Sequence, residues 1–119
     1  MAAPVFIRTF ALPSGPRVRL RLAVPADRER VECLLRERGV EASELDVRRL
    51  LTYDPSRRRV ACAFAPIDGK DALVGLAAID IERGAEVDTL VVDERITHGL
   101  GELMVRVLAE RAARSRRVA

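Results

Sequence analysis

The sequence predicts a single domain of the α/β (α+β) class, with a mixed, mainly antiparallel sheet flanked by helices. Its 119 residues suffice for one hydrophobic core but not for two. Apolar residues make up 49% of the chain and charged residues 33%, a balance typical of globular rather than disordered proteins. Strand-like runs joined by short turns alternate with stretches of helical periodicity, and this pattern predicts the class.

The chain begins with two strand-like runs, residues 5–11 and 17–23. The turn-forming residues 12–16, Leu-Pro-Ser-Gly-Pro, separate them. The second run alternates strictly, which predicts one face packed on a core. The opposite face is expected to be solvated and to carry Arg17, Arg19 and Arg21.

Two helices are expected next. Residues 25–27, Pro-Ala-Asp, favour a helix start, and Gly39 is a natural end for this first helix. Ser43 followed by Asp46 resembles a capping box that starts the second helix. The second helix must end ahead of Pro55, because proline disfavours helical backbone at the residue before it.

Three further strand-like runs, residues 60–65, 72–82 and 86–92, follow the helices. The loops between them are too short for a crossover, so they predict an antiparallel meander. The dipeptide 68–69, Asp-Gly, predicts a hairpin between the first two of these strands. Gly75, inside the middle strand, indicates a bulge or close packing.

The last part of the chain predicts a glycine turn followed by a long amphipathic helix. Gly99 and Gly101 allow the backbone to approach a ligand closely, because glycine has no Cβ. The helix N-terminus behind them offers unpaired N–H groups and the positive end of the helix dipole, which together favour phosphate. The apolar stripe of this helix consists of Leu100, Leu103, Met104, Val107 and Leu108.

Composition excludes several classes of protein. No apolar run reaches the length of a membrane span, and the N-terminus does not resemble a signal peptide. Cys33 and Cys62 lack a metal-type spacing, so they are interpreted as reduced, packed thiols in a cytoplasmic protein, with no metal site. The net charge of +3 comes almost wholly from arginine. Without interleaved aromatic residues, nucleic-acid binding is not expected of the arginine clusters.

From Arg17 onward, the order of elements and several short motifs resemble the GCN5-related N-acetyltransferase (GNAT) family. The most specific motif is the turn at residues 96–101, Ile-Thr-His-Gly-Leu-Gly, which matches the acetyl-CoA turn of the family. Residues 17–22, 26–27 and 73–75 support the resemblance. The chain is therefore expected to be one GNAT-like domain, residues 1–119, in which residues 1–16 form an additional strand and turn.

The resemblance implies an acyl-CoA N-acyltransferase-like fold that uses acetyl-CoA as co-substrate. In the family, the pyrophosphate of coenzyme A binds the backbone amides of the turn, and the pantetheine arm runs along the strand before it. The acetyl group is transferred directly to an amine, without a metal or a covalent intermediate. Carried over to this sequence, the binding residues are Leu90, Val91, Val92, Thr97, His98, Gly99, Leu100, Gly101 and Glu102.

Glu86 is the candidate catalytic base, since some family members place a carboxylate at the start of this strand. Asp88 shares its face and is a second candidate, and a solvated acid without catalytic role is the alternative for both. His98, the only histidine, lies in a variable position of the turn, where contact with solvent or phosphate is expected. Tyr53 is expected to anchor the second helix against the sheet, and Cys62 lies in an apolar strand without a partner base.

Two other functions remain open. Ile96 replaces the polar residue of the family turn, and the family normally continues with further strands beyond residues 116–119. A catalytically inactive GNAT-like binding or dimerisation module is therefore the main alternative, with nucleic-acid association as a third. Without a following strand, residues 86–92 are an exposed sheet edge, which predicts a homodimer unless the sequence is part of a longer chain. The amine acceptor is not identified by the sequence.

Overall fold

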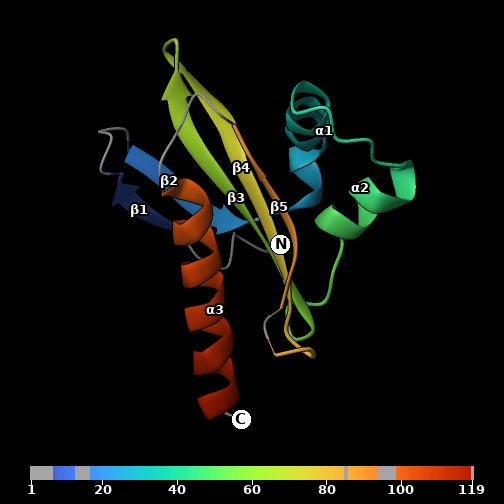
Figure 1. The fold of residues 1–119 in the computed structure, drawn as a ribbon, viewed down its shortest axis with the longest axis vertical. Coiled ribbons are helices and arrows are strands. Elements are labelled where there is room, and N and C mark those ends of the chain that lie inside the picture. Colours follow the sequence, from blue (N-terminus) through green and yellow to red (C-terminus); the bar gives the residue numbers. More distant parts are fainter. Residues whose placement is uncertain (1–6, 13–16, 85, 94–98, 119) are drawn as a thin grey trace.

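The computed structural model describes residues 7–12, 17–84, 86–93 and 99–118. Within these residues, five strands form one sheet in sequential order, and every neighbouring pair is antiparallel (Figure 1). The elements are β1 (Ile7–Ala11), β2 (Arg17–Leu22), the 3₁₀ turn η1 (Pro25–Asp27), α1 (Arg28–Glu37), α2 (Glu44–Leu51), β3 (Arg58–Ile67), β4 (Lys70–Asp80), β5 (Glu86–Val92) and α3 (Leu100–Val118). The predicted fold class and the predicted order of elements are confirmed.

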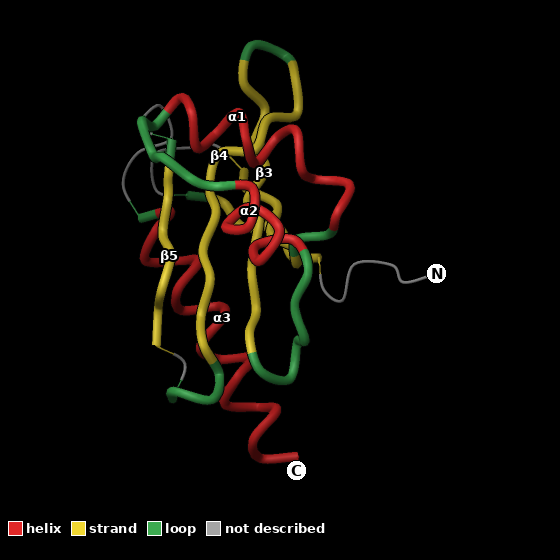
Figure 2. Tube along the Cα trace, turned by 90° about the vertical axis from the view of Figure 1, so that its right-hand side faces the viewer, coloured by secondary structure: helices red, strands yellow, loops and turns green. Residues whose placement is uncertain are grey.

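The sheet has helices on both faces. α3 packs on one face, against β3, β4 and β5, whereas α1 and α2 lie on the opposite face (Figures 1 and 2). Each face has its own core, because alternate residues of a strand point to opposite faces. The core under α3 includes Val18, Leu20, Ala77, Ile79, Leu100, Met104, Val107 and Leu108. The core under α1 and α2 includes Val31, Leu34, Val47, Leu50, Cys62, Phe64 and Leu76.

The apolar stripe predicted for the last helix is confirmed. Leu100, Met104, Val107 and Leu108 are buried, and Leu103 is partly buried against the same core. Among the helices that the structure describes, none combines the length and the apolar character that a membrane span requires.

The solvated position expected for Arg21 is corrected by the structure. Val18 and Leu20 are buried as predicted, but the Arg21 guanidinium pairs with the buried Asp27 through two hydrogen bonds of 2.6 and 2.8 Å. Asp27 also accepts a hydrogen bond from the backbone N–H of Val24. The ion pair attaches the first helical turn to β2, a contact that strand alternation alone does not reveal.

The start of α2 and the segment after it are tied down by side chains. The Ser43 hydroxyl accepts the Asp46 N–H (3.1 Å) and the Asp46 carboxylate accepts the Ser43 N–H (3.0 Å), which confirms the predicted capping box. The Tyr53 hydroxyl donates to the backbone oxygen of Ala23 (2.9 Å) and lies 3.2 Å from that of Val60. Tyr53 thus anchors the end of α2 to β2 and β3, as predicted.

The hairpin between β3 and β4 is tighter than predicted. Asp68 and Gly69 have φ of 51° and 77°, both in the left-handed region that a two-residue type I′ turn requires. Such a turn matches the twist of the strands, so pairing continues to Ile67 and Lys70. Both strands therefore extend closer to the turn than the apolar runs in the sequence indicate.

Gly75 lies beside a bulge and under α3. The register of β3 and β4 slips between Ala63 and Phe64, so Val74 has no partner on β3. A Cβ added at Gly75 would lie 2.7 Å from Sδ of Met104. Both expectations for Gly75, a bulge and close packing, are therefore met at this point of the sheet.

β5 is an edge strand of the described sheet. It pairs with β4 along one side, and no described strand pairs with its other side. Val87 is 36% exposed and Leu90 46%, although both are large apolar residues. The exposed edge predicted from the sequence is confirmed within the described residues, since the outer backbone groups of β5 pair with no described strand.

Candidate functional site

A bulge in β5 directs polar side chains toward the face that α1 and α2 cover. Val87 pairs with Ile79 and Thr89 pairs with Ala78, so Asp88 has no partner on β4. The extra residue of a bulge interrupts the alternation of a strand. Asp88 and the neighbouring Thr89 consequently both line the space on the α1 and α2 side.

Arg58, two strands away, holds this bulge. Its Nη2 donates a hydrogen bond of 2.9 Å to Oδ1 of Asp88, and the Thr89 hydroxyl donates to the same oxygen at 2.8 Å. The Nε of Arg58 is buried and has no hydrogen-bond partner among the described residues. The Arg58 guanidinium therefore extends across β4, and its Nη2 is hydrogen-bonded to the bulge residue Asp88.

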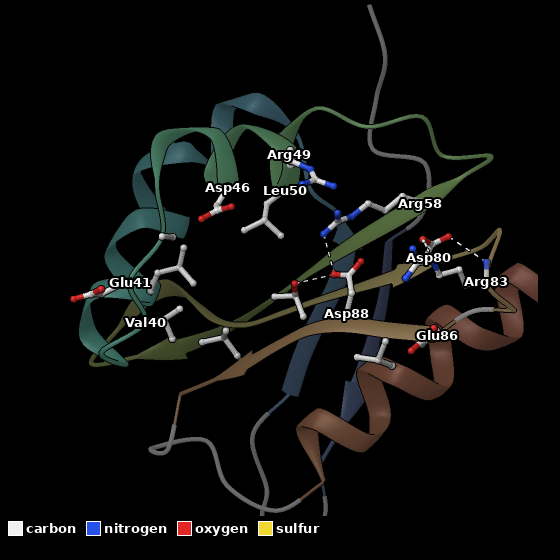
Figure 3. A pocket seen from close by; sticks show the side chains of 15 residues that line it. Val40, Glu41, Asp46, Arg49, Leu50, Arg58, Asp80, Arg83, Glu86 and Asp88 are labelled. Carbon is white, nitrogen blue, oxygen red and sulfur yellow. Dashed lines mark hydrogen bonds and ion pairs between the residues drawn. The ribbon is translucent and has the colours of Figure 1, made fainter.

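A cavity of about 530 Å³ lies between this part of the sheet and the two helices (Figure 3). Its walls are β5, α2 and the segment that joins α1 to α2. The lining residues are Leu35, Val40, Glu41, Ala42, Asp46, Arg49, Leu50, Arg58, Asp80, Arg83, Glu86, Val87, Asp88, Thr89 and Val91. The volume is within the range of small-molecule sites.

Most charges of the cavity are compensated by neighbours. Asp88 pairs with Arg58, and Arg83 Nε lies 3.7 Å from Oδ2 of Asp80. The backbone N–H of Ser43 and its hydroxyl hold the pKa of Asp46 below its ordinary value, and nearby Arg49 lowers it further. By contrast, the side chains of Glu41 and Glu86 make no hydrogen bond or ion pair with any described residue.

A second feature lies at the far end of β5, where α3 begins. Gly99 has φ of 96°, and a Cβ added there would meet no atom within 4 Å. The Gly99 carbonyl accepts a hydrogen bond from the N–H of Leu103 (2.9 Å), which is the first backbone hydrogen bond of α3. A Cβ added at Gly101 would lie 3.4 Å from Leu90 and 3.8 Å from Val92. Small residues therefore let the first turn of α3 pack against the end of β5, and no described atom lies close to the side-chain position of Gly99.

The structure brings some of the predicted binding residues together. Leu90 and Val92 lie against Gly101, Val91 is buried on the cavity side, and Glu102 is exposed in the first turn of α3. Leu100 is buried in the core below α3, so only its backbone is available to a ligand. Thr97 and His98 lie outside the described residues.

Glu86 and the glycine turn lie at opposite ends of β5. Val92 lies six positions after Glu86, which corresponds to about 20 Å of extended strand. Glu86 lines the cavity, as does Asp88, so both candidate carboxylates share one space. The candidate site is therefore elongated, with the helix N-terminus at one end of the strand and the carboxylates at the other.

Other candidates from the sequence are outside this site. Burial raises the pKa of the Tyr53 hydroxyl and of the Cys62 thiol to about 12, and neither side chain lines the cavity. Cys62 is packed as predicted, but Cys33 is exposed, which corrects the expectation that both thiols are packed. Within the described residues, no group of potential ligands has a geometry that could hold a metal ion.

Sequence reasoning missed Arg58 and the wall formed by Glu41, Asp46 and Arg49. Arg58 belongs to a run of three arginines that the sequence presents only as part of a turn. The contact between Arg58 and Asp88 joins residues 30 positions apart, and no local pattern encodes it. The capping box was the only signal near this wall, and it describes helix formation rather than a site.

No family model matches the sequence, and no curated protein matches it by sequence. Among solved structures, the fold is similar to the crystal structure of the GNAT domain of S. lividans PAT, with a TM-score of 0.73 and 19% sequence identity. The similarity covers 97% of this chain and 76% of that chain. At this identity the likeness concerns the fold, and the chain therefore has a GNAT-like, acyl-CoA N-acyltransferase-like fold.

Proposed function

We propose that the protein is an acetyl-CoA-dependent N-acetyltransferase that transfers the acetyl group directly to an amine. One observation carries the proposal. The N-terminus of α3 and the cavity with Glu86 lie at the two ends of one strand, β5, and no described strand pairs with the outer edge of β5. Such an arrangement can hold an elongated co-substrate along β5 and an acceptor beside it.

The end of β5 has backbone groups that point away from β4, toward the side where no described strand pairs. The Asp93 N–H donates to the carbonyl of Val74 on β4 (2.8 Å). Because backbone groups of a strand alternate in direction, those of Val92 and Leu90 point to the free edge. A pantetheine arm could pair with these groups as a neighbouring strand would.

The first turn of α3 suits the pyrophosphate of the co-substrate. The first N–H groups of a helix have no partner within the helix, and the helix dipole favours an anion there. At Gly99 no side chain covers the backbone, and Gly101 lets the first turn of α3 pack closely against Leu90 and Val92. We assign the pyrophosphate contacts to the backbone of residues 97–102, of which 99–102 are described.

The cavity side of β5 supplies the groups for the acceptor. Acetyl-CoA provides a thioester, so that an acetyl C–N bond forms as the C–S bond breaks, and coenzyme A leaves as the thiol. We assign Glu86 as the base that takes the proton from the ammonium form of the acceptor. Asp88 is bound by Arg58 and Thr89, so it is less available as a base than Glu86.

Calorimetric titration with coenzyme A tests the proposal, with Gly99→Ala as the variant. Gly99 and Gly69 both have positive φ and open space around a new Cβ, so Gly69→Ala imposes a matched backbone strain far from α3. We expect at least fivefold weaker binding for Gly99→Ala and unchanged binding for Gly69→Ala. Failure of the wild type to bind millimolar coenzyme A would contradict the proposal.

A non-catalytic binding or dimerisation module is the alternative. It is favoured by the apolar Ile96 in the turn and by the free edge of β5, where a second copy could add its own β5. Sedimentation equilibrium separates the two. A concentration-dependent dimer without coenzyme A binding supports the module, whereas coenzyme A binding with release of free thiol from acetyl-CoA supports the enzyme.

A further inference from the structure

The bulge at Asp88 decides which face of the sheet carries the side chain of Glu86. In a regular strand, residues an odd number of positions apart point to opposite faces. Glu86 and Thr89 are three positions apart, yet their partners on β4, Asp80 and Ala78, are two positions apart. Directly opposed residues of an antiparallel pair share a face. Glu86 and Thr89 therefore both lie on the face that α1 and α2 cover.

Without the bulge, Glu86 would turn to the other face. The second half of β5 is fixed by its core, because Val91 pairs with Leu76 and both belong to the core under α1 and α2. Regular alternation back from Val91 would place Asp88 opposite Ile79, a residue of the core under α3. It would place Glu86 on that side as well. Glu86 thus shares the face of the cavity because of one additional residue in β5.

Arg58 holds this additional residue from outside β5. It lies opposite Asp80 in the pairing of β3 with β4, and Asp80 in turn lies opposite Glu86, so all three share one face. The Arg58 guanidinium bonds diagonally past Asp80 to Asp88, with 2.9 Å between Nη2 and Oδ1 (Figure 3). The hydroxyl of Thr89 donates to the same oxygen. Because no described strand pairs with the outer side of β5, these two bonds are the side-chain restraints on the bulge within the described residues.

We infer that Arg58 is a positioning residue for Glu86. The inference rests on the proposed function, in which Glu86 takes the proton from the acceptor. Arg58 keeps Asp88 as the additional residue of the strand and thereby keeps the Glu86 carboxylate on the cavity side of β5. The pairing of β5 with β4 from Thr89 to Val92 does not depend on the bulge. Loss of Arg58 should therefore impair the base and leave the coenzyme A end of β5 intact.

Cross-strand NOEs measured by NMR spectroscopy test this control of register, with Arg58→Met as the decisive variant. Methionine retains an aliphatic side chain and removes the hydrogen-bond donors. In the wild type, NOEs should join Asp80 to Glu86 and Ile79 to Val87, as the pairing requires. We expect both sets to be lost in Arg58→Met and to be replaced by NOEs between Asp80 and Val87, because the register moves by one residue.

Arg57→Met is the matched control, because it removes the same charge at the neighbouring position. Its pair with Glu82 is mostly exposed, and the wild-type NOEs should remain. Asp88→Ala removes the contact from the other side and should change the register as Arg58→Met does, so the test does not depend on one variant. Wild-type NOEs in both Arg58→Met and Asp88→Ala would overturn the inference.

Kinetics separate a positioning role from a general loss of stability. The assay measures release of free thiol from acetyl-CoA, with 1-aminobutane as the probe acceptor. We expect Arg58→Met to lower kcat by about tenfold or more and to change KM for acetyl-CoA by less than about twofold. In a Glu86→Gln background the same substitution should have little further effect on kcat, because Arg58 acts through Glu86. An equal loss in both backgrounds would contradict the positioning role.

A separate titration with coenzyme A distinguishes failure of this inference from failure of the proposed function. Coenzyme A binding by the wild type, together with an unchanged register in both variants, overturns the positioning role and leaves the transferase proposal in place. A changed register in Arg58→Met, without coenzyme A binding by the wild type, supports the control of the bulge by Arg58 and overturns the transferase proposal.

Discussion

Arg58 at the start of β3 donates a hydrogen bond across β4 to Asp88 on β5, with 2.9 Å between Nη2 and Oδ1. Its side chain is 21% exposed and that of Asp88 38%. The bond fastens the bulge of the edge strand to the interior of the sheet. Because β5 has no second neighbour in the described sheet, side-chain contacts of this kind contribute to holding its shape.

Asp88→Ala is expected to lower the free energy of unfolding by about 1 kcal/mol, because it leaves the Arg58 guanidinium without its partner and the pair is partly screened by solvent. Urea denaturation measures this loss. Glu82→Ala is the control, since it removes the mostly exposed pair with Arg57. It should change stability by less than about 0.5 kcal/mol. Equal losses in the two variants would show that the Arg58 contact does not stabilise β5.

The ion pair of Arg21 and Asp27 predicts a dependence of stability on pH. Burial alone would raise the pKa of Asp27, but the hydrogen bonds from Arg21 and the Val24 N–H hold it below its ordinary value. The stability that this lower pKa contributes is fully present above the ordinary aspartate pKa of about 4 and is lost as pH falls through the lower folded value.

Asp27→Asn should therefore cost about 3 kcal/mol at pH 7, since it leaves Arg21 without a charged partner. The difference from the wild type should shrink below a pH of about 4. Urea titrations at several pH values measure this difference, and Asp68→Asn, in the exposed hairpin turn, should show none of it. A difference that stays constant down to strongly acidic pH would contradict the role of the ion pair.

Gly75→Ala is expected to destabilise the protein by about 1–3 kcal/mol through overpacking. The new Cβ would lie 2.7 Å from Sδ of Met104 and 3.3 Å from a methyl group of Leu100. Combining it with Met104→Ala gives a double-mutant cycle. The cost of Gly75→Ala should be smaller in the Met104→Ala background, and strictly additive costs would contradict the contact.

The two cysteines should react very differently with a disulfide reagent such as DTNB. Cys62 is buried with a thiol pKa of about 12, so it should react only after unfolding. Cys33 is exposed, but its hydrogen bond to Glu37 raises the pKa of its thiol. It should react in the native state, more slowly than a free thiol at neutral pH. Cys33→Ser should abolish the native-state reaction, and a remaining fast phase would show that Cys62 is accessible.

The elements that the sequence predicted well are those with strong local signals. The bounds of β5 agree with the predicted residues 86–92, because polar turn residues enclose a β-branched run. α3 and the capping box of α2 follow from side-chain spacing along one helix. The ends of β3 and β4 were predicted less well, since the two-residue turn extends pairing beyond the apolar residues.

By itself, the sequence determined the order of elements, the apolar faces, and the presence of a glycine-rich helix start after a strand that carries two acids. These features depend on neighbours within a few positions, which periodicity and turn chemistry report directly. Only the tertiary structure decided that Arg58 holds Asp88, that Arg21 is paired, and that Glu41 and Glu86 share one cavity. These relationships join segments far apart in the chain and depend on register and bulges, because a slip of one residue turns a side chain to the other face of the sheet.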